Sequence, residues 1–436
     1  MRTKISFLAL LAASMLLSSV SARADGPAIG TVREEPGATL LLPFFEVDLA
    51  NAGGRTTRFW INNASASAAM AHVTVWTDLS VPVLAFDVYL TGYDMQSIDM
   101  RDILNGSLPQ TASAGQDPND TISPKGASSQ DINFGPNCTG VLPPAPLSAG
   151  EVTALRNALT GAASSLLGGM CGGRSSPGRA QGYVTVDSVN TCTSAFPNDP
   201  NYQSGGSRQL DDRNILWGDF VYANGSNAFQ GAPLVAVIAN QTSTETTTSG
   251  QYTFYGRYNG WTAADHRAPL ATNFAGRYVR GSTQASVWRD PKVDQAAFTC
   301  GTLPDWYPMG QEGIVIFDQQ EHPEIPISYP VAPQPPNPGL MPFPAAAQKT
   351  LIGNGAAVNG VLAPGAFPVS FGSGWIYYNL NTFVTPAGSN PSEDPAASQA
   401  WIMTMRPVSG SAGIVGLIGG QATQLDSASV AVHFVP

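Results

Sequence analysis

Charge is scarce in this 436-residue chain, and so are long apolar runs. Asp, Glu, Lys and Arg make up 12% of the residues, with 21 basic against 31 acidic side chains and no basic cluster. An acidic chain without such a cluster repels phosphate backbones, so nucleic acid is not an expected partner. No run reaches the roughly 20 apolar residues that a transmembrane helix needs, so no such helix is expected.

Catalytic motifs are missing as well. The sequence contains no Gly-x-Ser-x-Gly elbow, no His-Glu-x-x-His pair, no phosphate-binding loop and no dinucleotide-binding Gly-x-Gly-x-x-Gly after a strand. Its four histidines lie far apart, and His72 alternates into a strand beside Thr74 and Trp76, which is typical of a structural histidine. No motif therefore assigns an enzymatic activity, and we regard the question of an enzyme as open, with a non-enzymatic role favoured.

The chain starts with the pattern of a signal peptide. In residues 1–24 two basic side chains precede an apolar stretch, and Ala22-Arg23-Ala24 matches the small-residue cleavage rule. We expect cleavage after Ala24 and export to the periplasm or the extracellular space. Without the three basic residues of this segment, 18 basic residues remain against 31 acidic ones, which gives a net charge of −13.

Cysteines are few and even in number, at positions 138, 171, 192 and 300, and none forms a Cys-x-x-Cys pair. In an exported protein this predicts two disulfides. We expect Cys138–Cys171, which would close the base of a helical excursion, and Cys192–Cys300. The other two pairings remain alternatives.

Alternation of apolar and polar residues dominates the rest of the sequence. Leu84, Phe86, Val88 and Leu90 alternate with smaller or polar residues, which is the period of a β-strand. Together with strands around residues 57–61 and 73–76 it predicts an antiparallel meander, and Pro43 predicts an edge or a bulge in an earlier strand. Further strands are expected at 182–189, 215–223, 234–240, 251–261, 286–288, 313–318, 370–380, 401–405, 414–418 and 429–434.

Two helical excursions are expected. Ser148 and Glu151 form a capping-box pattern, which predicts a helix near 147–161. Pro269 is placed to open a second short helix through Leu270, Phe274 and Tyr278. The predicted fold class is therefore all-β: an antiparallel β-sandwich, Ig-like or jelly-roll-like, with one or two short helices.

Three regions follow the signal peptide. Residues 25–330 are expected to form the main sandwich domain, and residues 331–347 a proline-rich strap or linker. Residues 348–436 hold a few further strands, which either stand apart or complete the same sandwich.

Several strings resemble a set of exported, β-rich bacterial proteins to which no activity is assigned. They include GRTTRFWINNAS, HVTVWTDLSVPVLAFDVYLTGYD, GYVTVDSVN, TFYGRY and DHRAPLATNFAGRYV, and they cover most of the mature chain. The resemblance implies export, and no ligand or catalytic residue follows from it.

Rings and charges are densest between residues 252 and 267. Flat rings beside Arg and Asp side chains suit a sugar or an extended peptide, because the ring covers apolar faces while the polar groups fix orientation. The alternative is that these residues have a structural role and fix a corner of the core through an Arg–Asp pair. The candidate ligand-binding residues are Tyr255, Arg257, Tyr258, Trp261, Asp265, His266 and Arg267.

Carboxylates offer two further hypotheses. Asp199, Asp211 and Asp212 lie in oxygen-rich loops that suit calcium, although Asp also forms ordinary turns. Asp78, Asp87, Asp187 and Asp219 lie in or beside apolar strands, where a pair across a cleft would permit glycoside hydrolysis.

Three functions follow from these observations. The first is an exported protein with a binding or structural role at the cell surface, in the periplasm or in the matrix, with a glycan or a cell-surface component as partner. The second is a secreted hydrolase that acts on polysaccharide with paired carboxylates. The third is an outer-membrane barrel, against which the even cysteines, the prolines and the strands that are apolar on both faces argue.

Overall fold

The computed structural model describes residues 35–203, 209–224, 228–239, 253–258, 265–311, 313–324, 341–355, 365–381, 398–409, 415–421 and 423–424. These residues form an all-β, sandwich-like fold of mostly antiparallel sheets with few helices, as the alternating pattern predicts. No helix among them is long and apolar enough to cross a membrane. The predicted strand at 429–434 and most of the proline-rich segment lie outside the described residues.

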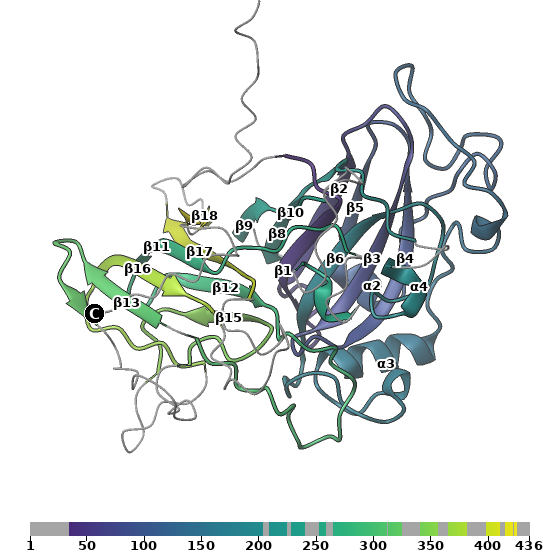
Figure 1. The fold of residues 1–436 in the computed structure, drawn as a ribbon. Coiled ribbons are helices and arrows are strands. Elements are labelled where there is room, and N and C mark those ends of the chain that lie inside the picture. The colour runs from purple at the N-terminus through teal and green to yellow at the C-terminus, as the bar shows by residue number, and fades with distance from the viewer. Residues whose placement is uncertain are drawn as a thin grey trace, which may run out of the picture.

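The described residues form three sheets (Figure 1). The first, which we call the N-terminal sheet, has the order β10-β1-β6-β3-β4. Its strands are β1 (Thr39–Asp48), β3 (Ala69–Thr77), β4 (Pro82–Leu90), β6 (Arg179–Val189) and β10 (Val235–Val237).

A second five-stranded sheet, the C-terminal sheet, has the order β14-β13-β16-β11-β19. Its strands are β11 (Asn273–Val279), β13 (Gly313–Asp318), β14 (Pro323–Glu324), β16 (Ser373–Asn379) and β19 (Thr423–Gln424). Here β16 lies between β11 and β13, so strands from far apart in the sequence complete one sheet.

The long sheet has nine strands in the order β15-β12-β17-β18-β9-β8-β2-β5, with β7 also paired to β2. Its β2 and β8 contact β1 of the N-terminal sheet, and its β17 contacts β11 of the C-terminal sheet. Its strands are β2 (Thr56–Asn63), β5 (Met95–Asp99), β7 (Leu216–Trp217), β8 (Asp219–Asn224), β9 (Ala228–Pro233), β12 (Gln284–Arg289), β15 (Ala347–Leu351), β17 (Ala400–Ser409) and β18 (Val415–Gln421).

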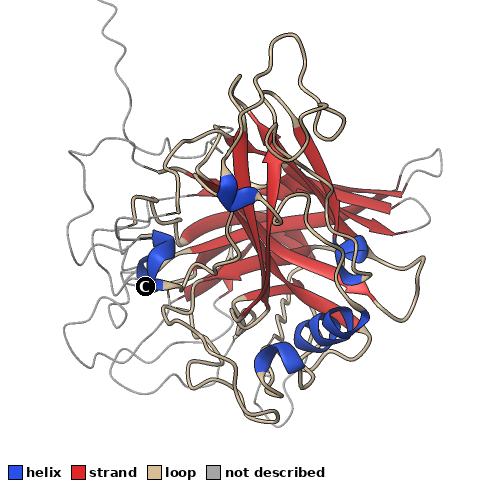
Figure 2. Ribbon diagram, turned by 90° about the vertical axis from the view of Figure 1, so that its right-hand side faces the viewer, coloured by secondary structure: helices blue, strands red, loops and turns tan. Residues whose placement is uncertain are grey.

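The few helices lie at the periphery of the strands (Figure 2). The predicted helix is confirmed as α3 (Ala149–Leu159), and Ser148 and Glu151 form the expected capping box. The other helices of the described residues are α2 (Met100–Leu104), α4 (Pro200–Gln203) and the 3₁₀ turns η1 (Pro136–Cys138), η2 (Ser165–Leu167) and η3 (Gly256–Tyr258).

The predicted meander is wrong in its first strand. β3 and β4 pair as an antiparallel hairpin, but β2 belongs to the long sheet, where it pairs with β5, β7 and β8. The segment after β2 crosses between sheets instead of reversing within one. Asn63 holds this crossing, because its amide donates to the carbonyls of Ser67 at 2.7 Å and Thr91 at 3.0 Å.

Pro43 produces a bulge, one of the two predicted outcomes. The register of β1 against β6 breaks between Leu42 and Phe45. β1 is not an edge strand, since β10 and β6 pair on either side of it. The bulge accommodates a residue that has no backbone N–H to donate.

Two local predictions around residues 251–279 are wrong. The expected helix after Pro269 is instead the strand β11, paired with β16. Phe274 and Tyr278 are both buried there, because positions four apart share a face in a strand as well as in a helix. The expected strand at 251–261 is a turn and the 3₁₀ helix η3 over its described residues 253–258.

The cysteines do form two disulfides, but the expected pairing is wrong. Cys138 bonds Cys192 and Cys171 bonds Cys300. Cys171 pairs with Phe298 through two backbone hydrogen bonds of 2.9 Å, which brings it next to Cys300. The excursion that contains α3 is thus bonded to the end of β6 and to the loop after β12, not closed upon itself.

Candidate functional site

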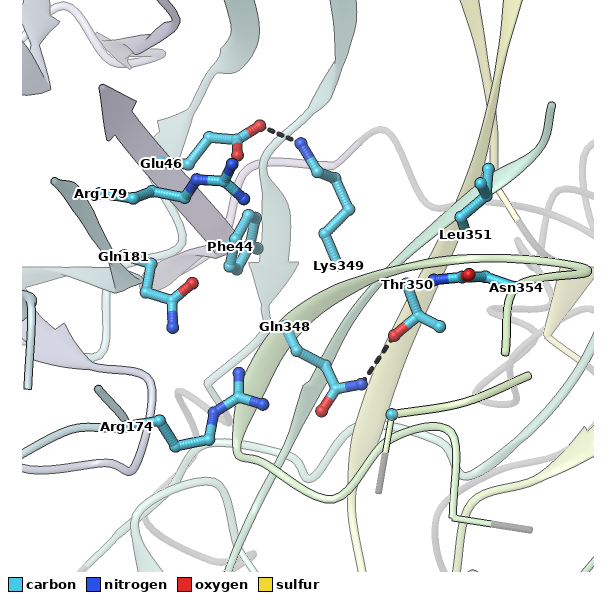
Figure 3. A pocket seen from close by; sticks show the side chains of 11 residues that line it. Phe44, Glu46, Arg174, Arg179, Gln181, Gln348, Lys349, Thr350, Leu351 and Asn354 are labelled. Carbon is cyan, nitrogen blue, oxygen red and sulfur yellow. Dashed lines mark hydrogen bonds and ion pairs between the residues drawn. The ribbon is translucent and has the colours of Figure 1, made fainter. Parts of the chain in front are cut away.

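A polar pocket lies where the edge strand β15 of the long sheet meets β1 and β6 of the N-terminal sheet (Figure 3). It holds about 160 Å³, less than the roughly 300–1,000 Å³ of sites for drug-sized ligands, so it suits a small one. Its lining residues are Phe44, Glu46, Arg174, Arg179, Gln181, Gln348, Lys349, Thr350, Leu351, Asn354 and Gly365.

Strand register places the first group of side chains. Glu46 on β1 lies opposite Gln181 on β6, and Asp48 lies opposite Arg179. Residues two apart on a strand share a face, so Gln181 and Arg179 both point to the side that faces β15. From β15 comes Lys349, which Figure 3 shows reaching toward Glu46.

Lys349 and Glu46 form a buried ion pair. The Lys349 ammonium donates to Oε1 of Glu46, and Arg55 donates to the same oxygen at 2.6 Å. The side chain of Glu46 is 3% exposed and that of Lys349 10%. The Lys349 nitrogen also lies 5.3 Å from the ring centroid of Tyr222 and 5.8 Å from that of Phe44. The ion pair is therefore held in place by Arg55 and by the rings of Tyr222 and Phe44.

This environment shifts both ionisations. Burial lowers the pKa of Lys349 to about 8, a shift that Glu46 opposes and the positive charge of Arg55 reinforces. Burial raises the pKa of Glu46, but the charges of Lys349 and Arg55 outweigh burial and the net effect is to lower this pKa. Glu46 is therefore ionised at neutral pH, and Lys349 loses its proton under mildly alkaline conditions.

Arg174 is fixed on the other side of the pocket by Asp78. Its Nε donates to Asp78 at 2.6 Å, and its backbone N–H donates to the same carboxylate at 3.0 Å. Gln181 adds a third hydrogen bond at 2.9 Å. The residue before Arg174 must be small, because a Cβ on Gly173 would lie 2.7 Å from Asp78 Oδ1.

Arg179 is the unneutralised cation of the pocket. It is exposed and forms no ion pair with any residue in the part of the chain that the structure describes. Asp48, opposite it, accepts instead from the backbone of Ala50 at 3.0 Å and Asn51 at 3.1 Å. The lining thus carries three positive charges and one negative charge in an acidic protein.

The neutral lining residues divide into two kinds. Gln348 is committed to internal bonds with Ala345, Pro342 and Thr350, so it shapes the pocket. In contrast, the side-chain oxygen of Gln181 and the side-chain amide of Asn354 accept or donate no hydrogen bond among the described residues, and both face the pocket.

The residues that the sequence suggested for ligand binding lie elsewhere, mostly in the core. Arg257 is 8% exposed, and Tyr255, Asp265 and Arg267 are at most 1% exposed. Tyr258 and His266 are partly buried, and Trp261 lies outside the described residues. Ligand binding by this set stays a prediction, but its described members are placed as the alternative expected, as a corner of the core.

A buried carboxylate contacts two of these residues, Tyr255 and Arg267. Asp187 on β6 accepts from the hydroxyls of Tyr202 at 2.6 Å and Tyr255 at 2.9 Å, and also from Thr39. Arg267 lies 3.6 Å from it. Arg257 forms a separate buried pair with Asp290 at 2.7 Å. Each buried carboxylate is thus surrounded by hydroxyl donors or a guanidinium, which offsets part of the desolvation of the charges.

The other carboxylates are engaged as well. His72 lies in register between Asp87 and Asp187 and hydrogen-bonds Asp87 at 2.7 Å and the Ala195 carbonyl at 2.9 Å, the structural role expected for it. Asp219 is exposed on β8. In the pocket Glu46 is the one carboxylate of the lining, so this site does not supply the pair that a hydrolase needs.

The calcium candidates contact protein donors. Asp199 accepts from Phe196 at 2.7 Å, and Asp211 pairs with Arg213. Asp212 contacts His266 at 2.7 Å and Arg267 at 3.4 Å. Within the described ranges, no group of three or more His, Cys, Asp or Glu side chains is placed to hold a metal ion.

Comparison with protein-family models, curated proteins and solved structures finds no match for this chain. The assignment of a function therefore rests on the geometry of the pocket.

Proposed function

We propose that the protein is an exported binding protein whose polar pocket takes a small anionic ligand. The observation that carries the proposal is the cationic lining, in which Glu46 and Arg174 are neutralised within the protein and Arg179 is not. Two disulfides are typical of an oxidising, non-cytoplasmic compartment, which supports export. Cleavage after Ala24 belongs to the same proposal.

Binding is favoured over catalysis by the state of the pocket's charged groups. Lys349 is held by Glu46, and Glu46 is shared with Arg55. A general acid or base must instead be free to give or take a proton from a substrate. Arg179, in contrast, is exposed at the pocket and has no ion-pair partner among the described residues, so it is available to an anion.

The test is calorimetric titration of the exported protein with sulfate at low ionic strength. We expect wild type to bind, and Arg179→Gln to weaken binding about tenfold or more, since a hydrogen bond to a charged group contributes roughly 1.5–3 kcal/mol. The matched control is Arg277→Gln, because Arg277 is an exposed arginine of β11 outside the pocket. Equal binding by all three proteins would refute the proposal.

A further inference from the structure

We propose that the ligand is a hydroxylated carboxylate of one-sugar size, such as a uronic acid, either free or at the end of a polysaccharide. This inference rests on the proposed function and narrows its ligand class. The carboxylate would bind at Arg179, and the hydroxyls would bind at Gln181 on the same strand and at Asn354 on the opposite wall.

The type of cation favours a planar acid. A guanidinium presents parallel N–H donors that match the two oxygens of a carboxylate, whereas an ammonium acts as a point charge. The unneutralised cation here is an arginine, while the lysine of the pocket is already engaged by Glu46. An oxyanion with two oxygens in one plane is therefore a better partner than a spherical ion.

The neutral polar side chains of the pocket suit a ligand with hydroxyl groups. Gln181 uses its N–H on Asp78, and this fixes its amide so that the side-chain oxygen is left as an acceptor. Asn354 adds both an acceptor and donors from the opposite wall, as Figure 3 shows. An acceptor is matched by an O–H donor, which fully ionised sulfate and acetate lack. A sugar acid supplies hydroxyls next to its carboxylate.

The size and shape of the pocket limit the size of the ligand. A pocket of about 160 Å³ admits one small ring but not a longer chain. Leu351 contributes an apolar side chain to the same wall, against which the C–H groups of a sugar ring can pack. Arg179 is exposed, so the terminal unit of a longer chain could also reach it.

The experiment titrates the full exported chain with glucuronate, glucose, acetate and sulfate, and with a short oligouronate. Glucuronate should bind about tenfold or more tightly than glucose, acetate or sulfate, because only glucuronate engages both the cation and the acceptors. If the oligouronate, counted per chain end, binds as tightly as glucuronate, the protein recognises the terminal unit of a chain. If only glucuronate binds, the ligand is a free sugar acid. Both outcomes support the inference.

Two variants distinguish a failure of this inference about the ligand from a failure of the proposed anion binding. Asn354→Ala should weaken glucuronate binding and leave sulfate binding unchanged, whereas Arg179→Gln should weaken both. If sulfate binds through Arg179 but glucuronate binds no better than sulfate, the inference is wrong and the anion pocket stands. If no anion binds in an Arg179-dependent way, both are wrong. The side chain of Asn354 is exposed and its backbone keeps the bonds to Phe367, so its removal should leave the fold intact.

Discussion

At the scale of single residues, the pocket depends on which charges are satisfied inside the protein. Asp187 gathers hydroxyls and an arginine around a carboxylate that is fully buried. Glu46 likewise takes two cations. Each carboxylate is the ion-pair partner of a buried cation, Arg267 for Asp187 and Lys349 for Glu46, so both belong to the framework of the fold. Arg179 differs because no such partner neutralises it.

Lys349 gives a testable pH dependence of stability. Its pKa is lowered from 10.5 to about 8 in the folded state, so the cost of charging it is fully present below pH 8. That cost is relieved as the pH rises toward 10.5, because in this window the unfolded chain binds the extra proton. Relative to Lys349→Met, wild type should gain on the order of 2 kcal/mol of unfolding free energy between pH 7 and 9.5.

Urea unfolding of both proteins at several pH values measures this difference. The Met variant retains Arg55 as a partner for Glu46, and staying below pH 9.5 limits the contribution of tyrosines. A stability difference that does not change with pH would show that Lys349 is not charged at a cost in the folded protein.

At the scale of elements, most strands could be predicted from the sequence because burial on one face imposes a period of two. The pairing of strands could not. β2 and β3 are neighbours in sequence yet belong to different sheets, and the short Asn-Asn-Ala-Ser segment between them reads like a hairpin turn. The residues of β11 also fit a helical pattern, because Phe274 and Tyr278, four residues apart, share a face in a helix and in a strand.

The disulfides allow a matched comparison at this scale. Cys171 lies three residues before Arg174 and ties that segment to Cys300, whereas Cys138–Cys192 joins segments that do not line the pocket. We expect Cys171→Ala/Cys300→Ala to lower sulfate affinity several-fold more than Cys138→Ala/Cys192→Ala does. Each loss should cost roughly 2–5 kcal/mol of stability. Titration well below each melting temperature checks this, and equal affinities would mean that the bridge does not position Arg174.

At the scale of the whole molecule, the pocket joins residues that the sequence holds far apart. Glu46 and Lys349 are separated by 303 positions and meet only because the edge strand of the long sheet lies against β1. No motif or local spacing in the sequence predicts that Glu46 and Lys349 form an ion pair. The densest cluster of rings and charges in the sequence, residues 252–267, is instead mostly buried in its described part, because charges paired with one another can also lie inside a core.

Anion binding at Arg179 is tested by a crystal structure of the exported protein soaked in selenate, a sulfate analogue that is located by its anomalous scattering. We expect a selenium peak in the pocket, within hydrogen-bonding distance of Arg179, and no such peak in Arg179→Gln crystals soaked in the same way. An empty pocket in wild-type crystals, or the same peak in both proteins, would contradict anion binding at Arg179.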